Sequence, residues 1–166
     1  MISFHDSIVR TIVPGPLGDM TVAATCHGLA GVFFADQRHL PPCSDWRQDA
    51  DHPVLRQATT QITEYFAGSR TRFELPLDLQ GGTAFQQNVW HALLAIPPGG
   101  TTTYGALSRA IGRPQAVRAV GTAIGRNPVS IIVPCHRVIG ADGTLTGYAG
   151  GLDRKSALLR LEGVVH

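Results

Sequence analysis

The chain has 166 residues, of which 43% are hydrophobic and 16% are charged, and its net charge at pH 7 is +2. This is enough apolar material for a folded core, so wholesale disorder is excluded. No apolar run approaches the ~18 residues that a membrane span needs. The first residues lack the basic-then-apolar pattern of a secretory signal, so we expect a soluble, cytoplasmic protein.

The charge is distributed unevenly along the chain. Residues 1–78 carry six arginines and nine acidic residues, whereas residues 79–166 carry eight basic and three acidic residues. An acidic half joined to a basic half is a hint of nucleic-acid or membrane contact, although chance explains a split of this size equally well. Thirteen of the fourteen basic residues are arginine, the side chain that suits phosphate recognition.

The three cysteines, Cys26, Cys43 and Cys135, are widely spaced and odd in number. They therefore do not form a disulfide framework. Cys26, His27 and Cys43 could supply zinc ligands, but their spacing matches no known zinc motif. We predict no metal site and attribute Cys26 and Cys43 to ordinary free thiols.

The first half is predicted to be a small α/β unit. Alternating and apolar runs predict strands over residues 8–13, 20–25 and 29–35, the first two joined as a hairpin. Residues 36–52 are polar and contain prolines, so they predict a loop. Helical spacing of apolar residues, with a proline at the start and a glycine after the end, predicts a helix over residues 53–67. Residues 72–79 are expected to be extended.

Residues 80–83 are short and flexible and mark the predicted boundary between domains 1–79 and 80–166. Beyond them, apolar spacing predicts an amphipathic helix over residues 85–96. Thr103 is a candidate N-cap for a helix over residues 104–111, and Pro114 is expected to open another helix through Ile124. Two short helices joined by a glycine-containing turn are a candidate helix-turn-helix, although such pairs are common elsewhere.

Residues 129–133 are a β-branched run, which predicts a buried strand or extended segment that ends in Pro134-Cys135-His136-Arg137-Val138. A cysteine beside histidine and arginine has an environment able to lower a thiol pKa, and the thiolate is the reactive form. The alternative is a buried structural cysteine next to a helix-capping histidine. Adjacent residues of a strand point to opposite faces, so a contact between Cys135 and His136 requires a turn or a bridging water.

The segment from Pro134 to Val138 resembles the hallmark of the O6-alkylguanine-DNA alkyltransferases, and the similarity covers about residues 81–163. The other matching motifs are Phe85-Gln86-Gln87-Asn88-Val89-Trp90, Ile96-Pro97-Pro98-Gly99, Thr103-Tyr104-Gly105, Ala116-Val117-Arg118-Ala119-Val120-Gly121, Asn127-Pro128, Gly147-Tyr148-Ala149-Gly150-Gly151 and Leu158-Leu159-Arg160-Leu161-Glu162-Gly163. The first half is similar more loosely, through Pro16-Leu17-Gly18 and Tyr65-Phe66-Ala67-Gly68.

The resemblance implies a protein that moves an alkyl group from O6 of guanine in DNA onto its own cysteine, once and irreversibly, without a cofactor. Cys135 would be the acceptor, and His136 would take the thiol proton through a bound water. Glu162 would orient His136, at the end of a helix for which Asp153 is the expected N-cap. Tyr104 would donate a hydrogen bond toward guanine N3, and Asn127 would tie the second helix to the active-site segment.

The resemblance also implies where the DNA and the base lie. Arg118 would fill the space that a flipped nucleotide leaves, and the helix that carries it would lie in the minor groove. The predicted DNA-binding residues are Thr103, Ala116, Arg118, Ala119 and Arg126. The predicted base pocket is formed by Pro134, Val138, Gly147, Tyr148 and Ala149. Some relatives have a hydroxyl residue where this chain has Ala149, and its absence suggests a pocket tolerant of larger alkyl groups.

The fold that the resemblance implies is a ribonuclease H-like N-terminal domain and a mainly helical, winged-helix-like C-terminal domain. We expect a monomer that binds double-stranded DNA with little sequence preference. The range of alkyl groups, activity on O4-alkylthymine, cooperativity on DNA and the role of the acidic half are not set by the sequence.

Three other functions are less consistent with the residues. A transcription factor would not explain the segment around Cys135, and the chain has no room for a fused regulatory domain. A non-reactive alkyltransferase-like protein would lack Cys135, and a Cys-His hydrolase would need an oxyanion loop that does not stand out.

Overall fold

The computed structural model describes residues 2–164. Its first half forms a sheet of order β3-β2-β1-β4, in which β1 (Val9–Val13), β2 (Met20–Thr25) and β3 (Gly28–Phe34) are antiparallel neighbours. These strands confirm the three predicted runs. The predicted loop over residues 36–52 contains two short elements that the polar composition concealed, η1 (Cys43–Asp45) and β4 (Arg47–Gln48), which pairs parallel with β1.

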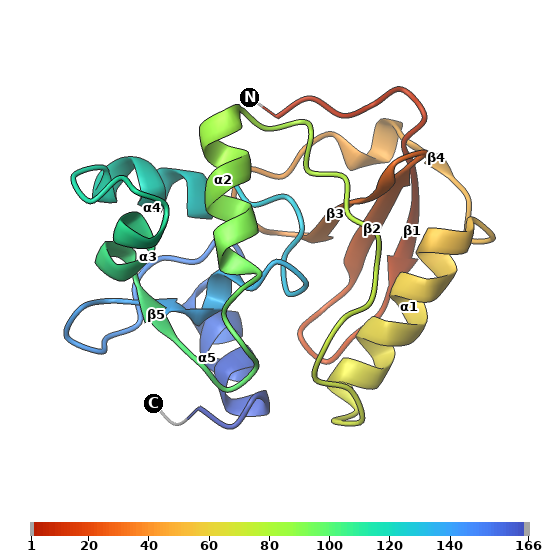
Figure 1. Ribbon diagram of the computed structural model, residues 1–166. Helices are drawn as coiled ribbons and strands as arrows, with labels where there is room; N and C mark the ends of the chain where they lie inside the picture. The colour runs from red at the N-terminus through yellow and green to blue at the C-terminus, as the bar shows by residue number, and fades with distance from the viewer. Residues whose placement is uncertain (1, 165–166) are drawn as a thin grey trace.

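Helix α1 (Pro53–Phe66) packs on the sheet, as Figure 1 shows. Its apolar face buries Leu55, Ala58, Ile62 and Tyr65. Every residue of β3 is buried, and the edge of this strand meets the second half of the chain through a bridge between Val32 and Val129. Because β3 is buried on both faces, it is a continuous apolar run rather than an alternating one.

The second half is mainly helical. Its helices are α2 (Ala84–Leu93), α3 (Tyr104–Ala110), α4 (Val117–Gly125) and α5 (Leu152–Leu161), with a short turn η2 (Cys135–Arg137) between α4 and α5. The two-residue strands β5 (Thr102–Thr103) and β6 (Val138–Ile139) pair in parallel. In Figure 1 these elements gather on the opposite side of the sheet unit from α1. The structure therefore confirms an N-terminal sheet unit followed by a helical unit.

Three local predictions are wrong. Helix α4 begins at Val117 rather than at Pro114, because Ala116 N–H donates to the carbonyl of Arg113 and closes a turn first. Helix α5 begins at Leu152 after Gly151, so Asp153 lies in the first turn and is not the N-cap. At φ 92° the backbone of Gly151 lies in a region open to glycine, which lets the chain enter α5 without a side-chain cap.

Residues 129–133 are buried as predicted, but they form turns instead of a strand. Ile131 adopts φ 75°, a left-handed conformation that a β-branched residue rarely takes. Backbone bonds from Ile132 N–H to Ser130 O and from Val133 N–H to Val129 O close the turns. The β-branched composition of this segment predicts that it is buried, but it does not predict the backbone conformation.

The two units share one buried apolar cluster, which includes Val22 and Leu55 from the first and Trp90 and Leu158 from the second. Because the core does not separate the two units, it does not mark a domain boundary, and the proposed boundary between domains 1–79 and 80–166 stays a prediction. Among residues 2–164, no helix is long and apolar enough to cross a membrane.

Arg154 of α5 fastens the helical unit to the sheet unit. Its Nε donates to Leu17 O at 2.9 Å, its Nη1 to Asp36 Oδ1 at 2.7 Å, and its guanidinium lies 4.4 Å from the centroid of the Phe34 ring. We expect Arg154→Leu to lower the free energy of unfolding by about 1–2 kcal/mol, because a stacking contact and a backbone acceptor are lost. Urea denaturation measures this. Asp36→Asn should change stability less, because Asp36 is exposed. Unchanged stability of Arg154→Leu would contradict the assignment.

Candidate active site

Cys135 lines a pocket of about 450 Å3 together with residues from four other segments of the chain. The side chain is 5% exposed and belongs to the first residue of η2. The other predicted site residues that line the pocket are Tyr104, Arg118, Arg126, Gly147, Tyr148 and Ala149. The structure thus brings together residues that are up to 45 positions apart in the sequence (Tyr104 to Ala149).

Asn127 builds the segment that presents Cys135. Its Nδ2 donates to the carbonyl of Val133 at 2.8 Å, and its Oδ1 accepts from the N–H of Val129 at 3.0 Å. These bonds clamp both ends of the buried turn that precedes Cys135 and join it to the end of α4. The geometry matches the predicted tie between the second helix and the active-site segment.

Behind Cys135, the carboxylate of Glu162 accepts four hydrogen bonds. His136 Nε2 lies 2.8 Å from Oε2, Arg137 donates from Nε to Oε1 at 2.8 Å and from Nη2 to Oε2 at 2.9 Å, and Tyr65 donates its hydroxyl to Oε2 at 2.7 Å. The side chain of Glu162 is only 3% exposed. A buried carboxylate needs such partners to remain charged.

The protonation states of this network follow from its contacts. Burial alone raises the pKa of Glu162, but the hydrogen bonds from His136 and Arg137 outweigh it and hold that pKa at about 2. Burial lowers the pKa of His136 despite the opposing effect of Glu162. His136 is therefore neutral at pH 7 and donates Nε2–H to the carboxylate, which leaves a lone pair on Nδ1. This Nδ1 is buried and finds no hydrogen-bond partner among residues 2–164.

The Cys135 thiol departs from the sequence-based expectation of a lowered pKa. Burial raises the pKa of Cys135, and the opposing effects of Asn127 and of the Lys155 charge do not reverse it. The reason is that the thiol is removed from water, and the charge of Lys155 acts on it too weakly to offset this desolvation. The thiol is thus protonated at neutral pH and needs a base, which the free Nδ1 of His136 can supply.

Lys155, the only lysine of the chain, holds the loop that faces Cys135. It is fully buried and donates from Nζ to the carbonyls of Thr146 at 2.5 Å and Gly147 at 3.2 Å. Burial lowers its pKa to about 8. On the same loop, a Cβ at Gly150 would lie 2.8 Å from the ring of Tyr148, so a larger residue there would displace that ring.

Tyr104 lines the pocket from the first position of α3. Its hydroxyl donates to Thr146 O at 3.4 Å and accepts from Thr146 Oγ1 at 3.1 Å. The neighbouring Thr103, predicted to bind DNA, uses its hydroxyl to cap α3 by accepting from the N–H of Ala106 at 3.1 Å. The cap occupies one acceptor lone pair of Thr103.

The predicted site residues Pro134, Val138, Ala116 and Ala119 do not line the pocket. Pro134 and Val138 are buried, and Val138 pairs with Thr102 in the short β5–β6 ladder. Arg118 and Ala119 are the two predicted DNA-binding residues that lie on α4, and both are exposed. Ala116, which is half-buried, and Arg126 flank the helix, and Thr103 belongs to β5.

The residues of the site region that were not predicted as site residues include Tyr65, Arg137, Lys155, Arg38 and His39. Arg38 and His39 line the pocket, and Arg38 N–H donates to the carbonyl of Ala149 at 2.9 Å. Arg137 stands inside the hallmark segment, and an arginine that is 5% exposed requires a carboxylate partner. For Tyr65, the only signal in the sequence was the loose similarity of Tyr65-Phe66-Ala67-Gly68 to the alkyltransferase family.

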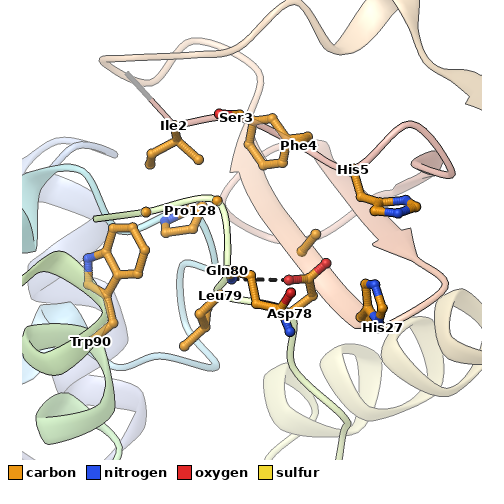
Figure 2. A pocket seen from close by; sticks show the side chains of 13 residues that line it. Ile2, Ser3, Phe4, His5, His27, Asp78, Leu79, Gln80, Trp90 and Pro128 are labelled. Carbon is orange, nitrogen blue, oxygen red and sulfur yellow. Dashed lines mark hydrogen bonds between the residues drawn. The ribbon is translucent and has the colours of Figure 1, made fainter. Parts of the chain in front are cut away.

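A second cluster lies far from Cys135, where the side chains of His5, Cys26 and His27 place their ligand atoms within 4.8 Å of one another. Figure 2 shows His5 and His27 close together at one end of a pocket of about 270 Å3. The sequence analysis named Cys26 and His27 as possible zinc ligands, but it did not name His5. A structural zinc site takes four ligands, and the nearby Asp78 already accepts from Thr25 Oγ1 at 2.5 Å and Gln80 N–H at 3.1 Å. The absence of a metal stays a prediction.

Comparison with known proteins places this site in a family. Residues 8–79 match the model of the 6-O-methylguanine DNA methyltransferase ribonuclease-like domain, and residues 84–164 match that of the 6-O-methylguanine DNA methyltransferase DNA binding domain. The chain belongs to the 6-O-methylguanine DNA methyltransferase family. The resemblance inferred from the sequence motifs is thereby confirmed.

Individual relatives agree over nearly the whole chain. The methylated-DNA–protein-cysteine methyltransferase of Mycobacterium tuberculosis H37Rv is 50% identical over 153 residues, 92% of this chain and 90% of the relative. The protein of that name from Methanosarcina acetivorans is 46% identical and covers 92% of this chain and 96% of its own length. The crystal structure of Mycobacterium tuberculosis OGT in complex with DNA superposes with a TM-score of 0.84 at 47% identity, covering 93% of this chain and 92% of that one.

Proposed function

We propose that the protein repairs DNA by transferring an alkyl group from O6 of guanine to Sγ of Cys135, once per molecule. Family membership makes it a methylated-DNA–protein-cysteine methyltransferase, and its substrate is DNA. The single observation that carries the assignment to Cys135 is that it lines a pocket and directly precedes His136, which pairs with a buried carboxylate.

The chemistry follows from the protonation states. The thiol proton passes through a bridging water to Nδ1 of neutral His136, and Glu162 stabilises the imidazolium that forms. The thiolate attacks the alkyl carbon in line with the bond to O6. A C–S bond forms as the C–O6 bond breaks, and its electron pair leaves with guanine, which gains a proton. Tyr104, which lines the same pocket, donates toward guanine N3 as the leaving group departs. The thioether product has no easy route back to the thiol, so the protein is consumed.

The alkyl carbon is out of reach inside a duplex, so the nucleotide must be flipped out of the stack. We propose that α4 lies in the minor groove, where Arg118 fills the vacated space. Arg118 and Ala119 are exposed on this helix, and Arg118 also lines the Cys135 pocket. The minor groove carries a degenerate code, which suits a protein that must act at any sequence.

Several finer assignments belong to this proposal. The three antiparallel strands followed by the parallel β4 and α1 support a ribonuclease H-like first domain. The short β5–β6 ladder beside α3 and α4 supports a winged-helix-like second domain. The proposal includes a monomer that acts in the cytoplasm, without a cofactor.

Ala149 gives the proposal a specificity prediction. It lines the pocket with a methyl group where some relatives carry a hydroxyl, so we expect Ala149→Ser to narrow the range of alkyl groups that react. The measurement is the ratio of repair rates for O6-butylguanine and O6-methylguanine in duplex DNA. This ratio should fall in Ala149→Ser, because a hydroxyl adds bulk and polarity to the pocket wall. An unchanged ratio would contradict the proposed effect of Ala149 on the range of alkyl groups.

The number of alkyl groups transferred per protein tests the proposed function. A fixed amount of protein is incubated with excess duplex DNA that contains tritiated O6-methylguanine, and with a second duplex that contains tritiated O4-methylthymine. We expect one label per molecule from O6-methylguanine, after which transfer stops. Continued release of labelled product into solution would indicate a hydrolase and overturn the proposal. The second duplex shows whether the base pocket also admits an alkylated pyrimidine.

A further inference from the structure

We propose that Tyr65 is a positioning residue of the alkyl-transfer reaction, through which the N-terminal unit sets the basicity and orientation of His136. The inference rests on the proposed function of Cys135 and His136. It gives the first half of the chain, which contributes none of the reacting groups, a defined part in the reaction rate.

The geometry makes Tyr65 a direct partner of the carboxylate. Its hydroxyl donates to Glu162 Oε2 at 2.7 Å, and the same oxygen lies 2.8 Å from His136 Nε2. The two donors therefore compete for electron density on one atom. Tyr65 belongs to α1, 97 residues before Glu162, so this hydrogen bond joins the two units at the active-site network.

The tyrosine is well suited to act as a permanent donor. Its side chain is 3% exposed, and its ring packs against Phe66 and Phe73, each with a centroid distance of 5.3 Å. Burial, followed by the charge of Glu162, raises the pKa of Tyr65 far above its usual value. The hydroxyl keeps its proton across the physiological range, and the fixed ring leaves it little freedom to find another acceptor.

The other charged and titratable groups around this network come from several elements. Arg137 of η2 holds both carboxylate oxygens, the charge of Lys155 of α5 acts on His136, and Cys135 precedes His136 in η2. Arg70 and Arg72, which follow α1, line a crevice of about 290 Å3 together with Tyr65 and Glu162. All of these groups remain when only the Tyr65 hydroxyl is removed, so its effect can be measured separately.

Removal of the hydroxyl has a defined sign. Without this donor, Oε2 carries more negative charge and attracts the imidazolium form of His136 more strongly. The pKa of His136 should rise, so the neutral base should appear only at higher pH. The carboxylate also loses one of its four anchors, which loosens the orientation of His136 toward Cys135.

The test is the pH dependence of the reaction of Tyr65→Phe with free O6-benzylguanine, which avoids any contribution from DNA binding. The variant keeps the ring and its packing. We expect the rate constant at neutral pH to fall roughly 2- to 10-fold, the range of a single lost hydrogen bond. The acidic limb of the pH–rate profile should move to higher pH, so the deficit should shrink as pH rises.

Two controls separate this effect from altered packing. Phe73→Leu disturbs the same aromatic contacts without touching the carboxylate, and its acidic limb should stay where the wild-type limb lies. Site-specific 3-fluorotyrosine at position 65 keeps the hydrogen bond and makes the donor more acidic, so it should move the limb to lower pH. An acidic limb that is identical in all four proteins would overturn the role of Tyr65. Failure of wild-type protein to alkylate Cys135 would overturn the proposed function instead.

Discussion

Replacing Glu162 with alanine is expected to damage both the stability and the reactivity of this protein. Arg137 is 5% exposed and its Nε and Nη2 both bind the Glu162 carboxylate. Removing one partner of a buried ion pair costs about 3–5 kcal/mol, because the remaining charge is left without compensation. The free energy of unfolding, measured in urea at pH 7, should fall by that amount.

The same substitution should slow alkyl transfer by about 10²–10⁴-fold, the range for loss of an oriented general base. His136 would lose the acceptor that fixes its tautomer and stabilises its charged form. Glu162→Gln is the matched control, because it keeps the shape but not the charge. It should retain more stability than Glu162→Ala and still react slowly. Wild-type rates in both variants would contradict the relay.

The pH dependence of stability follows from the same carboxylate. The pKa of Glu162 is held at about 2, below its ordinary value of 4.5. A carboxyl group whose pKa is lowered by folding contributes stability above its ordinary pKa, and this contribution is lost as pH falls toward the folded value. Wild-type protein should therefore lose stability between about pH 4.5 and pH 2, and Glu162→Gln should lose less over that interval.

Replacing Arg118 with alanine should weaken repair of duplex DNA by roughly 10- to 100-fold, because flipping a nucleotide costs a few kcal/mol and the side chain would no longer fill the gap in the stack. Reaction with free O6-benzylguanine, which needs no flipping, should remain near the wild-type rate. Arg118 is exposed and makes no contact with the Glu162 network.

Arg160→Ala is the matched control for Arg118, because Arg160 is also exposed but lies on α5 and does not line the Cys135 pocket. It should change duplex repair little. Equal losses of Arg118→Ala on duplex and free base would contradict the proposed role of Arg118 in flipping and point to an effect on the pocket itself.

Much of the fold could be predicted because local signals agreed with the final packing. Alternating or continuous apolar runs predicted the three sheet strands, and apolar spacing with a proline at the start and a glycine after the end predicted α1 within one residue. Residues 129–133 failed because their path depends on the buried amide of Asn127, whose partners are backbone groups that only the folded chain brings together. A β-branched run cannot report such a turn.

The candidate site likewise has features that the sequence predicted and features that it did not. Cys135, His136 and Glu162 were predicted because their motifs are distinctive, and the structure joins His136 to Glu162 by a hydrogen bond, with Cys135 preceding His136 in η2. The raised pKa of the Cys135 thiol was missed because a cation nearby in sequence is not a cation in contact, and burial outweighs it. Tyr65 was missed because its partner lies 97 residues away and nothing local marks a packed helix tyrosine as a hydrogen-bond donor.

Cys135, and neither Cys26 nor Cys43, is proposed to accept the alkyl group. The most direct test is the mass of each cysteine-containing peptide after the protein reacts with an equimolar duplex that carries O6-methylguanine. We predict that the Cys135 peptide gains the mass of one CH2, since S–H becomes S–CH3, while the Cys26 and Cys43 peptides are unchanged. Methylation of Cys26 or Cys43, or an unmodified Cys135 peptide after the DNA has been repaired, would contradict this account.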